Sequence, residues 1–257
     1  MRKHTPSAQH RIPLLTVLTC AALAAGGCAT PGPNHAYLAR RAEDPIIDRL
    51  PGVPDAEIST YLTEVNELYG IAYDPFTDHL FLRVCPGNFV RVIDRPAGKI
   101  KRSFYVNGLP PGHGDLAIRS IDRHLFFAEQ ERPELLETTL DGRTVRKIAL
   151  EGLEGSPAGV AYDQKHDHLL ILKGGGQTCV TTYDLAGKPI TSITLDRNVR
   201  LTSLAFDSVA REFYVPLADE PSVGVFNAQG RFLRSLTAPG GARDYVDVGP
   251  RSFLRLF

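Results

Sequence analysis

Hydrophobic and polar residues alternate in short runs along the chain, and one run of 13 residues returns four times. Each copy has an apolar stretch, a polar turn and a second apolar stretch, the pattern of two strands joined by a hairpin. The copies share an alanine, and successive alanines lie 44 or 45 residues apart. They read GIAYDPFTDHLFL from Gly70, DLAIRSIDRHLFF from Asp115, GVAYDQKHDHLLI from Gly159 and SLAFDSVAREFYV from Ser203.

Each copy is followed by two more β-rich stretches that flank a glycine, so each unit contains four short predicted strands. The glycines are Gly98, Gly142, Gly187 and Gly230. In the first unit we expect strands at 70–73, 80–84, 89–93 and 100–106. A four-stranded unit every 40–45 residues is typical of a β-propeller. A parallel βαβ array is excluded because it needs helices between its strands, and no helical pattern of useful length occurs after residue 27.

The two ends of the chain predict the number of blades. The segment IIDRLPG at 46–52 resembles VIDRPAG at 92–98 and adds Gly52 to the series of turn glycines. We therefore expect the N-terminus to supply the last two strands of a closing blade, the second of them within 58–65. The C-terminus is expected to supply the first two, near 245–248 and 253–257. Five blades then account for the chain, and six are the alternative. Closure through shared ends removes exposed sheet edges.

The sequence of the repeats resembles that of the NHL-type, YncE-like and gluconolactonase-like β-propellers. The segment VGVFNAQGRFL at 223–233 is similar to the third strand, turn and fourth strand of an NHL-type repeat. This resemblance covers residues 44–257 and implies an all-β propeller. It implies no single activity, because such folds carry lactonases, phosphatases and pure binding modules.

The first 27 residues have the parts of a secretory signal peptide: basic residues, an apolar run of about 14 residues and a small-residue exit. The segment LAAGGC, which ends at Cys28, resembles the lipobox of bacterial lipoproteins. That resemblance implies acylation of Cys28 by chains such as palmitate, cleavage before it and, with Ala29 following, an outer-membrane location. Cleavage after Ala24 is the alternative and leaves Cys28 a free thiol. We expect a tether at 28–43 and the propeller at 44–257.

The overall charge argues against nucleic acid as a partner. The sequence has 29 basic and 29 acidic residues, and removal of the signal leaves 26 and 29. No basic surplus remains to neutralise phosphates. We expect the partners to be the membrane, through the lipid, and an envelope protein or small-molecule ligand.

Two residue types recur at fixed repeat positions, and we assign them to the fold. His79, His124 and His168 each directly precede a second strand, so one metal ion would have to be reached from three different blades. Asp74, Asp163 and Asp207 end first strands, where a carboxylate binds the N–H groups of the following turn.

Candidate ligand-binding residues lie where the blades depart from the repeat, on the face that carries the fourth-to-first and second-to-third strand loops. The irregular loop at 110–115 contributes most, and we expect its acidic residue and the one at 129 to face solvent. The candidates are Glu67, His113, Asp115, Glu129, Arg200 and Asp244. The acidic members, Glu67, Asp115, Glu129 and Asp244, supply the oxygen ligands that Ca²⁺ prefers. They equally fit a solvated polar rim.

No catalytic motif emerges from the sequence, so no cofactor is assigned. Cys85 and Cys179 are expected to be separate thiols, because blades that are not adjacent hold their Cα atoms too far apart for a disulfide. The favoured interpretation is a binding or interaction module in the cell envelope. The alternative is a divalent-metal-dependent hydrolase resembling the gluconolactonase-like propellers, in which a metal ion polarises a carbonyl group.

Overall fold

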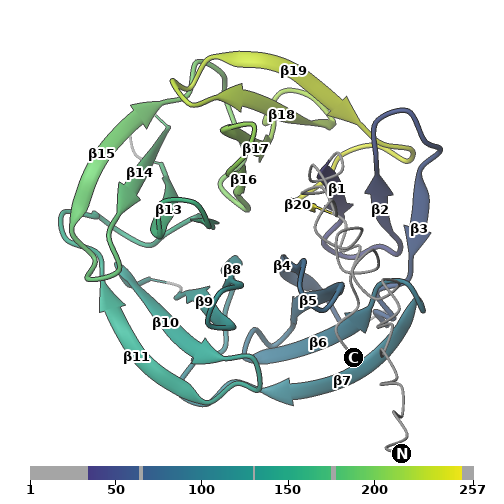
Figure 1. The fold of residues 1–257 in the computed structure, drawn as a ribbon, viewed down its shortest axis with the longest axis horizontal. Helices are drawn as coiled ribbons and strands as arrows, with labels where there is room; N and C mark the ends of the chain where they lie inside the picture. The colour runs from purple at the N-terminus through teal and green to yellow at the C-terminus, as the bar shows by residue number, and fades with distance from the viewer. Residues whose placement is uncertain (1–33, 64–65, 130, 175–177, 251–257) are drawn as a thin grey trace, which may run out of the picture. The chain divides into compact units, whose positions relative to one another are not determined.

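The structure, a computed structural model, describes residues 34–63, 66–129, 131–174 and 178–250. The described chain forms five four-stranded antiparallel sheets around a common axis, as Figure 1 shows. Cys28 and residues 253–257 lie outside the described residues, as does the expected signal peptide. The prediction of a five-bladed, all-β propeller is confirmed.

Four sheets are built from consecutive strands, and each runs from the axis outward in chain order. The first contains β4 (Leu68–Asp74), β5 (His79–Val84), β6 (Phe89–Asp94) and β7 (Lys99–Tyr105). The second contains β8 (Leu116–Arg119), β9 (His124–Ala128), β10 (Glu134–Thr139) and β11 (Thr144–Ala149). The third contains β12 (Gly159–Asp163), β13 (His168–Lys173), β14 (Cys179–Tyr183) and β15 (Pro189–Thr194). The fourth contains β16 (Ala205–Asp207), β17 (Glu212–Pro216), β18 (Ser222–Asn227) and β19 (Phe232–Thr237).

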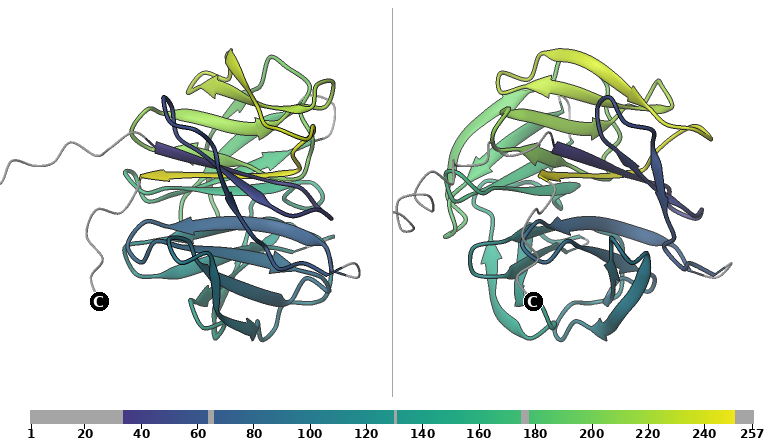
Figure 2. Two further views of the ribbon diagram at one scale, coloured as in Figure 1. Left: turned by 90° about the vertical axis from the view of Figure 1, so that its right-hand side faces the viewer. Right: turned by 45° about the vertical axis from the view of Figure 1, so that its right-hand side comes forward.

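The fifth sheet joins the two ends of the chain, but not in the way that the sequence suggested. Its innermost strand is β20 (Tyr245–Pro250), followed outward by β1 (Asn34–Ala39), β2 (Ile46–Arg49) and β3 (Ala56–Ile58). The second strand therefore comes from the N-terminal side, within the residues expected to form a tether, and not from 253–257. Six residue pairs join β1 to β20, from Asn34 opposite Pro250 to Ala39 opposite Tyr245. Figure 2 shows these two strands side by side.

The core is divided among the interfaces between neighbouring blades. The described residues form five buried hydrophobic clusters, and each combines side chains from two adjacent sheets. The inner strand β4 is buried along its whole length, whereas most of the outer strand β7 is exposed. Neighbouring blades cover both faces of the inner strands, which explains why β4, β12 and β16 are buried throughout although each ends in an aspartate.

The turn glycines have the conformation that their repeat position predicts. Gly52, Gly98, Gly142, Gly187 and Gly230 all have φ between 60° and 87°, in the left-handed region that favours glycine. Gly230 also touches the neighbouring blade, because a Cβ atom there would lie 2.1 Å from the carbonyl oxygen of Thr194. The backbone N–H of Asp196 donates to the Gly230 carbonyl oxygen at 3.1 Å. This turn therefore sets both a hairpin and a contact between blades.

Candidate functional site

A pocket of about 370 Å³ opens at the end of the axis that carries the predicted loop face. It lies beside the starts of the inner strands β4 and β20. The side chains that give it chemical character are Arg41, Tyr69, His113, Glu154, Ser156, Thr202 and Tyr245. They combine one guanidinium group, aromatic rings and hydroxyl groups, so the pocket presents a polar surface with both donors and acceptors. Of the six candidates from the sequence, His113 lines it directly.

His113 is held over the pocket by the irregular loop that contains it. Its ring packs on the ring of Tyr69, with the two centroids 4.2 Å apart. Burial, and then a hydrogen bond with Cys85, raise the pKa of Tyr69 to about 12, so this phenol stays neutral at physiological pH. The two ring planes are tilted by 49° to each other, and together they form an aromatic wall of the pocket.

Arg83 holds the same loop from below, and its guanidinium group is completely buried. It donates to the carbonyl oxygens of Gly87 at 2.6 Å and Ala128 at 2.7 Å, and to those of Gly114 at 3.0 Å and Gly112 at 3.2 Å. Burial lowers the pKa of Arg83 to about 10, against the opposing effect of Asp115, so the side chain remains charged at neutral pH. The cation thus connects the first and second blades and shapes the loop above it.

Asp244 and Arg200, two of the candidates predicted from the sequence, form an ion pair near the pocket. Arg200 Nη1 lies 3.1 Å from Asp244 Oδ1, and the backbone N–H of Arg41 donates to Asp244 Oδ2 at 2.9 Å. Burial opposes the charge on Arg41, but Tyr245, Asp244 and Glu67 outweigh it and raise the pKa of this guanidinium group. Glu67 therefore belongs to the same charged group, near the pocket.

Asp115 does not face solvent, which corrects the expectation from its loop position. Its side chain is 1% exposed and points towards the axis, where Oδ2 accepts the backbone N–H groups of Leu204 at 3.0 Å and Val160 at 3.2 Å. Burial raises the pKa of Asp115 well above its usual value. The physical reason lies in the ring, because inner strands that meet at the axis leave N–H groups that need an acceptor. Asp115 connects three blades and is a structural residue.

Glu129 is also buried, and it belongs to a separate ion-pair group on the second blade. Its Oε1 accepts from Lys147 Nζ at 2.7 Å, and the same Nζ lies 3.0 Å from Glu134. The four carboxylates considered as Ca²⁺ ligands thus have different settings: Glu67 and Asp244 near Arg41, Asp115 at the axis and Glu129 beside Lys147. Among the described residues, no three of these four carboxylates bring their oxygen atoms within 4.8 Å of one another, as a shared metal ion would require.

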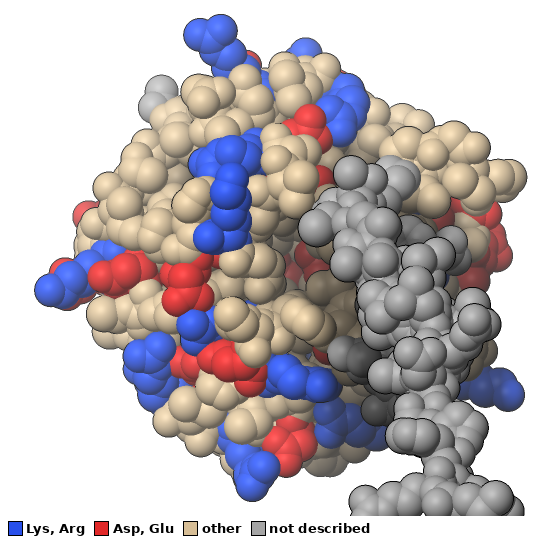
Figure 3. Space-filling view, in the orientation of Figure 1, with Lys and Arg blue, Asp and Glu red and all other residues tan. Residues whose placement is uncertain are grey.

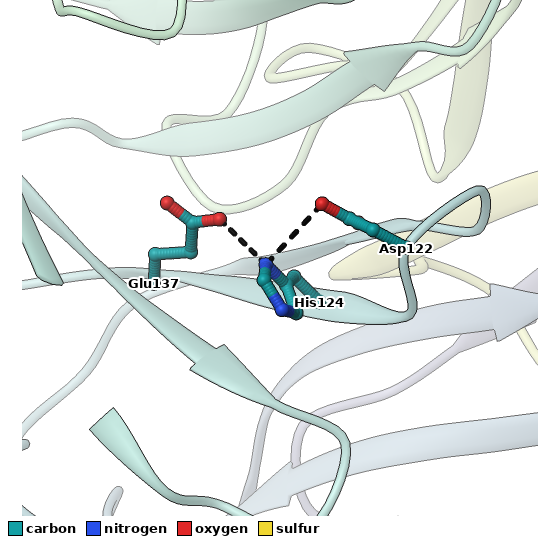
Figure 4. Close-up of side chains that lie close together, drawn as sticks. All are labelled: Asp122, His124 and Glu137. Carbon is teal, nitrogen blue, oxygen red and sulfur yellow. Dashed lines mark hydrogen bonds and ion pairs between the residues drawn. The ribbon is translucent and has the colours of Figure 1, made fainter. Parts of the chain in front are cut away.

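One group of residues has the spacing of a metal site, and Figure 4 shows it. Among the described residues, the ligand atoms of Asp122, His124 and Glu137 lie within 4.8 Å of one another. His124 Nδ1 is 2.7 Å from Glu137 and 3.4 Å from Asp122. Arg146 Nε lies 2.5 Å from the other Glu137 oxygen, and Arg119 lies 2.6 Å from Asp122. These contacts describe an ion-pair network in which arginines neutralise the carboxylates.

The other recurrent residues have the positions that the repeat predicts. His79, His124 and His168 begin β5, β9 and β13, in three different sheets. Each recurrent aspartate binds the backbone of its own turn. Asp74 accepts from Phe76 at 3.1 Å, Asp163 from Lys165 at 3.0 Å and Asp207 from Val209 at 2.8 Å. Cys85 and Cys179 are free thiols.

Sequence reasoning missed the pocket residues Arg41, Thr202 and Tyr245. Arg41 lies in the segment assigned to the tether, and the other two lie in or beside inner strands, where the pattern indicates only packing. The missing signal is the pairing of β1 with β20, which brings residues 41 and 245 to the same rim. Figure 3 shows basic and acidic side chains interspersed over the face in view, without a large field of one sign.

These features define a class of protein: a five-bladed β-propeller with a polar pocket at one end of its axis. No protein-family model and no curated protein sequence matches the chain. Among solved structures, 1105 chains match, so the fold is widespread and says little about activity.

Two of the matching structures illustrate the likeness. A chain of a nidogen/laminin complex is 11% identical with a TM-score of 0.60, over 85% of this chain and 99% of that chain. A chain of the hydrazine synthase of Kuenenia stuttgartiensis is 14% identical with a TM-score of 0.46, over 74% of this chain and 53% of that chain. The first likeness supports the propeller fold. No helix in the described part of the chain is long and apolar enough to cross a membrane.

Proposed function

We propose that this protein is a lipid-anchored interaction module of the bacterial cell envelope, which binds a partner through the pocket on its loop face. The observation that carries the binding role is the convergence of Tyr69, His113, Arg41 and Tyr245 on one pocket. The lipid anchor rests on the sequence around Cys28. The first residue of the propeller, Asn34, follows Cys28 by six positions, so the anchor requires only a short connection.

The pocket is suited to binding a partner, because two of the acids beside it are already held by contacts within the fold. Asp244 is engaged with Arg200 and the Arg41 backbone, and Asp115 with two backbone N–H groups below. What a partner meets is the aromatic wall, the carboxylate of Glu154 and the hydroxyl group of Ser156, because the Thr202 hydroxyl donates to the Asp244 carbonyl oxygen at 2.6 Å. Aromatic side chains with polar tips are common at protein interfaces for this reason. We therefore expect a polar small molecule or a loop of an envelope protein to bind here.

In-cell photo-cross-linking tests the binding role. A photoreactive amino acid at Ser156 labels whatever occupies the pocket, and the same amino acid at Ile190, exposed on the outer strand β15, is the control. We expect a discrete adduct from position 156 that is absent at position 190. The adduct should weaken when His113 is changed to alanine, because this change removes half of the aromatic wall. Identical adducts at both positions, or none at 156, would contradict the proposal.

Cell fractionation tests the anchor independently. One acyl chain binds a membrane only marginally, so stable attachment needs the several chains that lipoproteins of this kind carry. The parent protein should be released from membranes only by detergent, whereas the Cys28→Ala protein should be recovered in the soluble fraction. If both proteins partition alike, Cys28 is not the anchor.

A further inference from the structure

A second pocket, of about 240 Å³, lies at the other end of the axis, where the inner strands β4, β8, β12 and β16 end. It is lined mainly by apolar side chains, which come from turns and strand ends of all five blades. The largest of these side chains are Tyr73, Phe76, Ile118, Tyr162, Phe206 and Val209. The volume is below the range of about 300–1,000 Å³ typical of sites for drug-sized ligands, so a matching ligand is small.

Most polar groups of this pocket are used by the fold. Gln164 donates to the carbonyl oxygen of Ile118 at 2.7 Å and accepts from the backbone N–H of Ser120 at 3.2 Å. Asp207 accepts the N–H groups of its own turn and the side-chain amide of Asn34. These contacts hold the rim in place and leave little capacity for a ligand.

Two polar side chains retain capacity to bind. Ser120 is 5% exposed as a residue, and its buried hydroxyl oxygen has no hydrogen-bond partner among the described residues. Such buried, unsatisfied groups are uncommon in native structures and need an explanation. The carboxylate of Asp247 accepts the backbone N–H groups of Tyr73 at 2.5 Å and Val248 at 2.8 Å. An ionised carboxylate has about four acceptor sites, so further donors can be accommodated.

The charge of the pocket selects the kind of ligand. Its charged groups are Asp247 and Asp207, and the described lining residues include no lysine, arginine or histidine. Aromatic rings line the same pocket as these acids, and both a carboxylate and the face of an aromatic ring attract a cation. An anionic ligand would meet two acids without a compensating base.

We infer that this pocket binds a small organic ammonium compound, with the ammonium group on Asp247 and an apolar body against Tyr73, Phe76, Tyr162 and Phe206. The Ser120 hydroxyl supplies a further hydrogen bond to a polar substituent. This inference does not depend on the proposed function of the loop face, because the two pockets lie at opposite ends of the axis and share no lining residue.

Isothermal titration of the full chain with three probes of similar shape tests the chemistry. The probes are 2-phenylethylamine, 2-phenylethanol and 3-phenylpropionate. Burial raises the pKa of Asp247 to about 7, so the titrations are run at pH 8, where most of this carboxyl group is ionised. We expect the amine to bind at least about tenfold more tightly than the alcohol, since hydrogen bonds to charged groups are the stronger ones. The carboxylate should not bind. Equal binding of amine and alcohol, or no binding of the amine, would overturn the inference.

Two rim variants provide a matched pair that leaves Asp247 and the core untouched. Val209 lines the pocket, and Ile121 has the same repeat position in another blade without lining it; both are 77% exposed. We expect Val209→Lys to weaken binding of the amine by about tenfold, because the new cation repels it, and Ile121→Lys to leave it close to the parental value. Asp247→Asn should abolish the preference for the amine over the alcohol. Equal effects of the two lysine variants would contradict the inference.

The sequence contains a competing occupant, which the same titration distinguishes. Residues 251–257, RSFLRLF, follow the pocket residue Pro250 directly and combine two arginines with apolar side chains. A full chain with Arg251→Glu and Arg255→Glu should bind the amine at least as tightly as the parent, because the change removes two cations and adds two anions. If only this variant binds the amine, the chain's own segment is the occupant, and the inference of a free ammonium ligand is wrong.

Discussion

Replacing Asp115 by alanine tests whether an axial carboxyl group holds the ring together. In the native structure Oδ2 of this residue, at the entry to β8, accepts the N–H groups of Val160 in β12 and Leu204 beside β16. The variant keeps the backbone and the neighbouring hydrophobic clusters but removes the acceptor. Two buried N–H donors on two different blades then have no partner.

The size of the effect follows from those two donors. A buried donor left without a partner costs about 1–3 kcal/mol, so two cost about 2–6 kcal/mol. Part of this is offset, because Oδ1 of Asp115 itself has no partner among the described residues and its desolvation is relieved. We therefore expect a loss of about 2–4 kcal/mol from a stability that is typically about 5–15 kcal/mol. For a domain of this size, this lowers the melting temperature by about 5–15 °C.

Thermal unfolding followed by circular dichroism measures this loss, and Asp184→Ala is the matched control. Asp184 also accepts two backbone N–H groups, those of Ala186 and Lys188, both at 2.9 Å, but at a surface turn where water can replace the carboxylate. The control should melt close to the parental temperature. Asp115→Asn should lose less than Asp115→Ala, because an amide keeps one oxygen acceptor and matches the neutral acid that the raised pKa favours. If Asp115→Ala melts with the control, the carboxyl group does not hold the blades.

Two further predictions concern stability. Gly230→Ala should destabilise the protein by about 2–4 kcal/mol and Gly52→Ala by about 1 kcal/mol, as measured by denaturant titration. Both glycines have φ of 80°, but only at Gly230 does a Cβ atom collide with the Thr194 carbonyl; equal losses would refute the contact between blades. Burial raises the pKa of Asp247 to about 7 in the folded state, so the folded protein binds this proton more tightly than the unfolded chain does. The free energy of unfolding is therefore highest below about pH 4, and it falls as the pH rises to about 7. Unfolding midpoints at several pH values should therefore fall less steeply for Asp247→Asn than for the parent, and parallel curves would contradict the shift.

The sequence alone determined the local structure and the number of blades. The repeat of 44 or 45 residues predicted four strands per unit, and β5 and β6 agree with the expected bounds to within one residue. The turn glycines were identifiable for a local reason, since a two-strand hairpin needs a left-handed residue wherever the fold places it. The recurrent aspartates and histidines likewise depend only on neighbours in the chain. Residues with a local structural role can be recognised in the sequence because they recur at the same position of each repeat.

The tertiary structure alone decided how the ring closes and what lies at its axis. The segment that forms β1 lacks the sequence pattern of the repeat, and its partner β20 is some 200 residues away, so no local pattern indicates the pairing. Asp115 looks like a loop residue, and its burial arises only because strands from three blades meet around it. Both pockets collect one or a few side chains from several blades. These residues have no regular spacing along the chain, because they come from different blades and are brought together only by the closure of the ring.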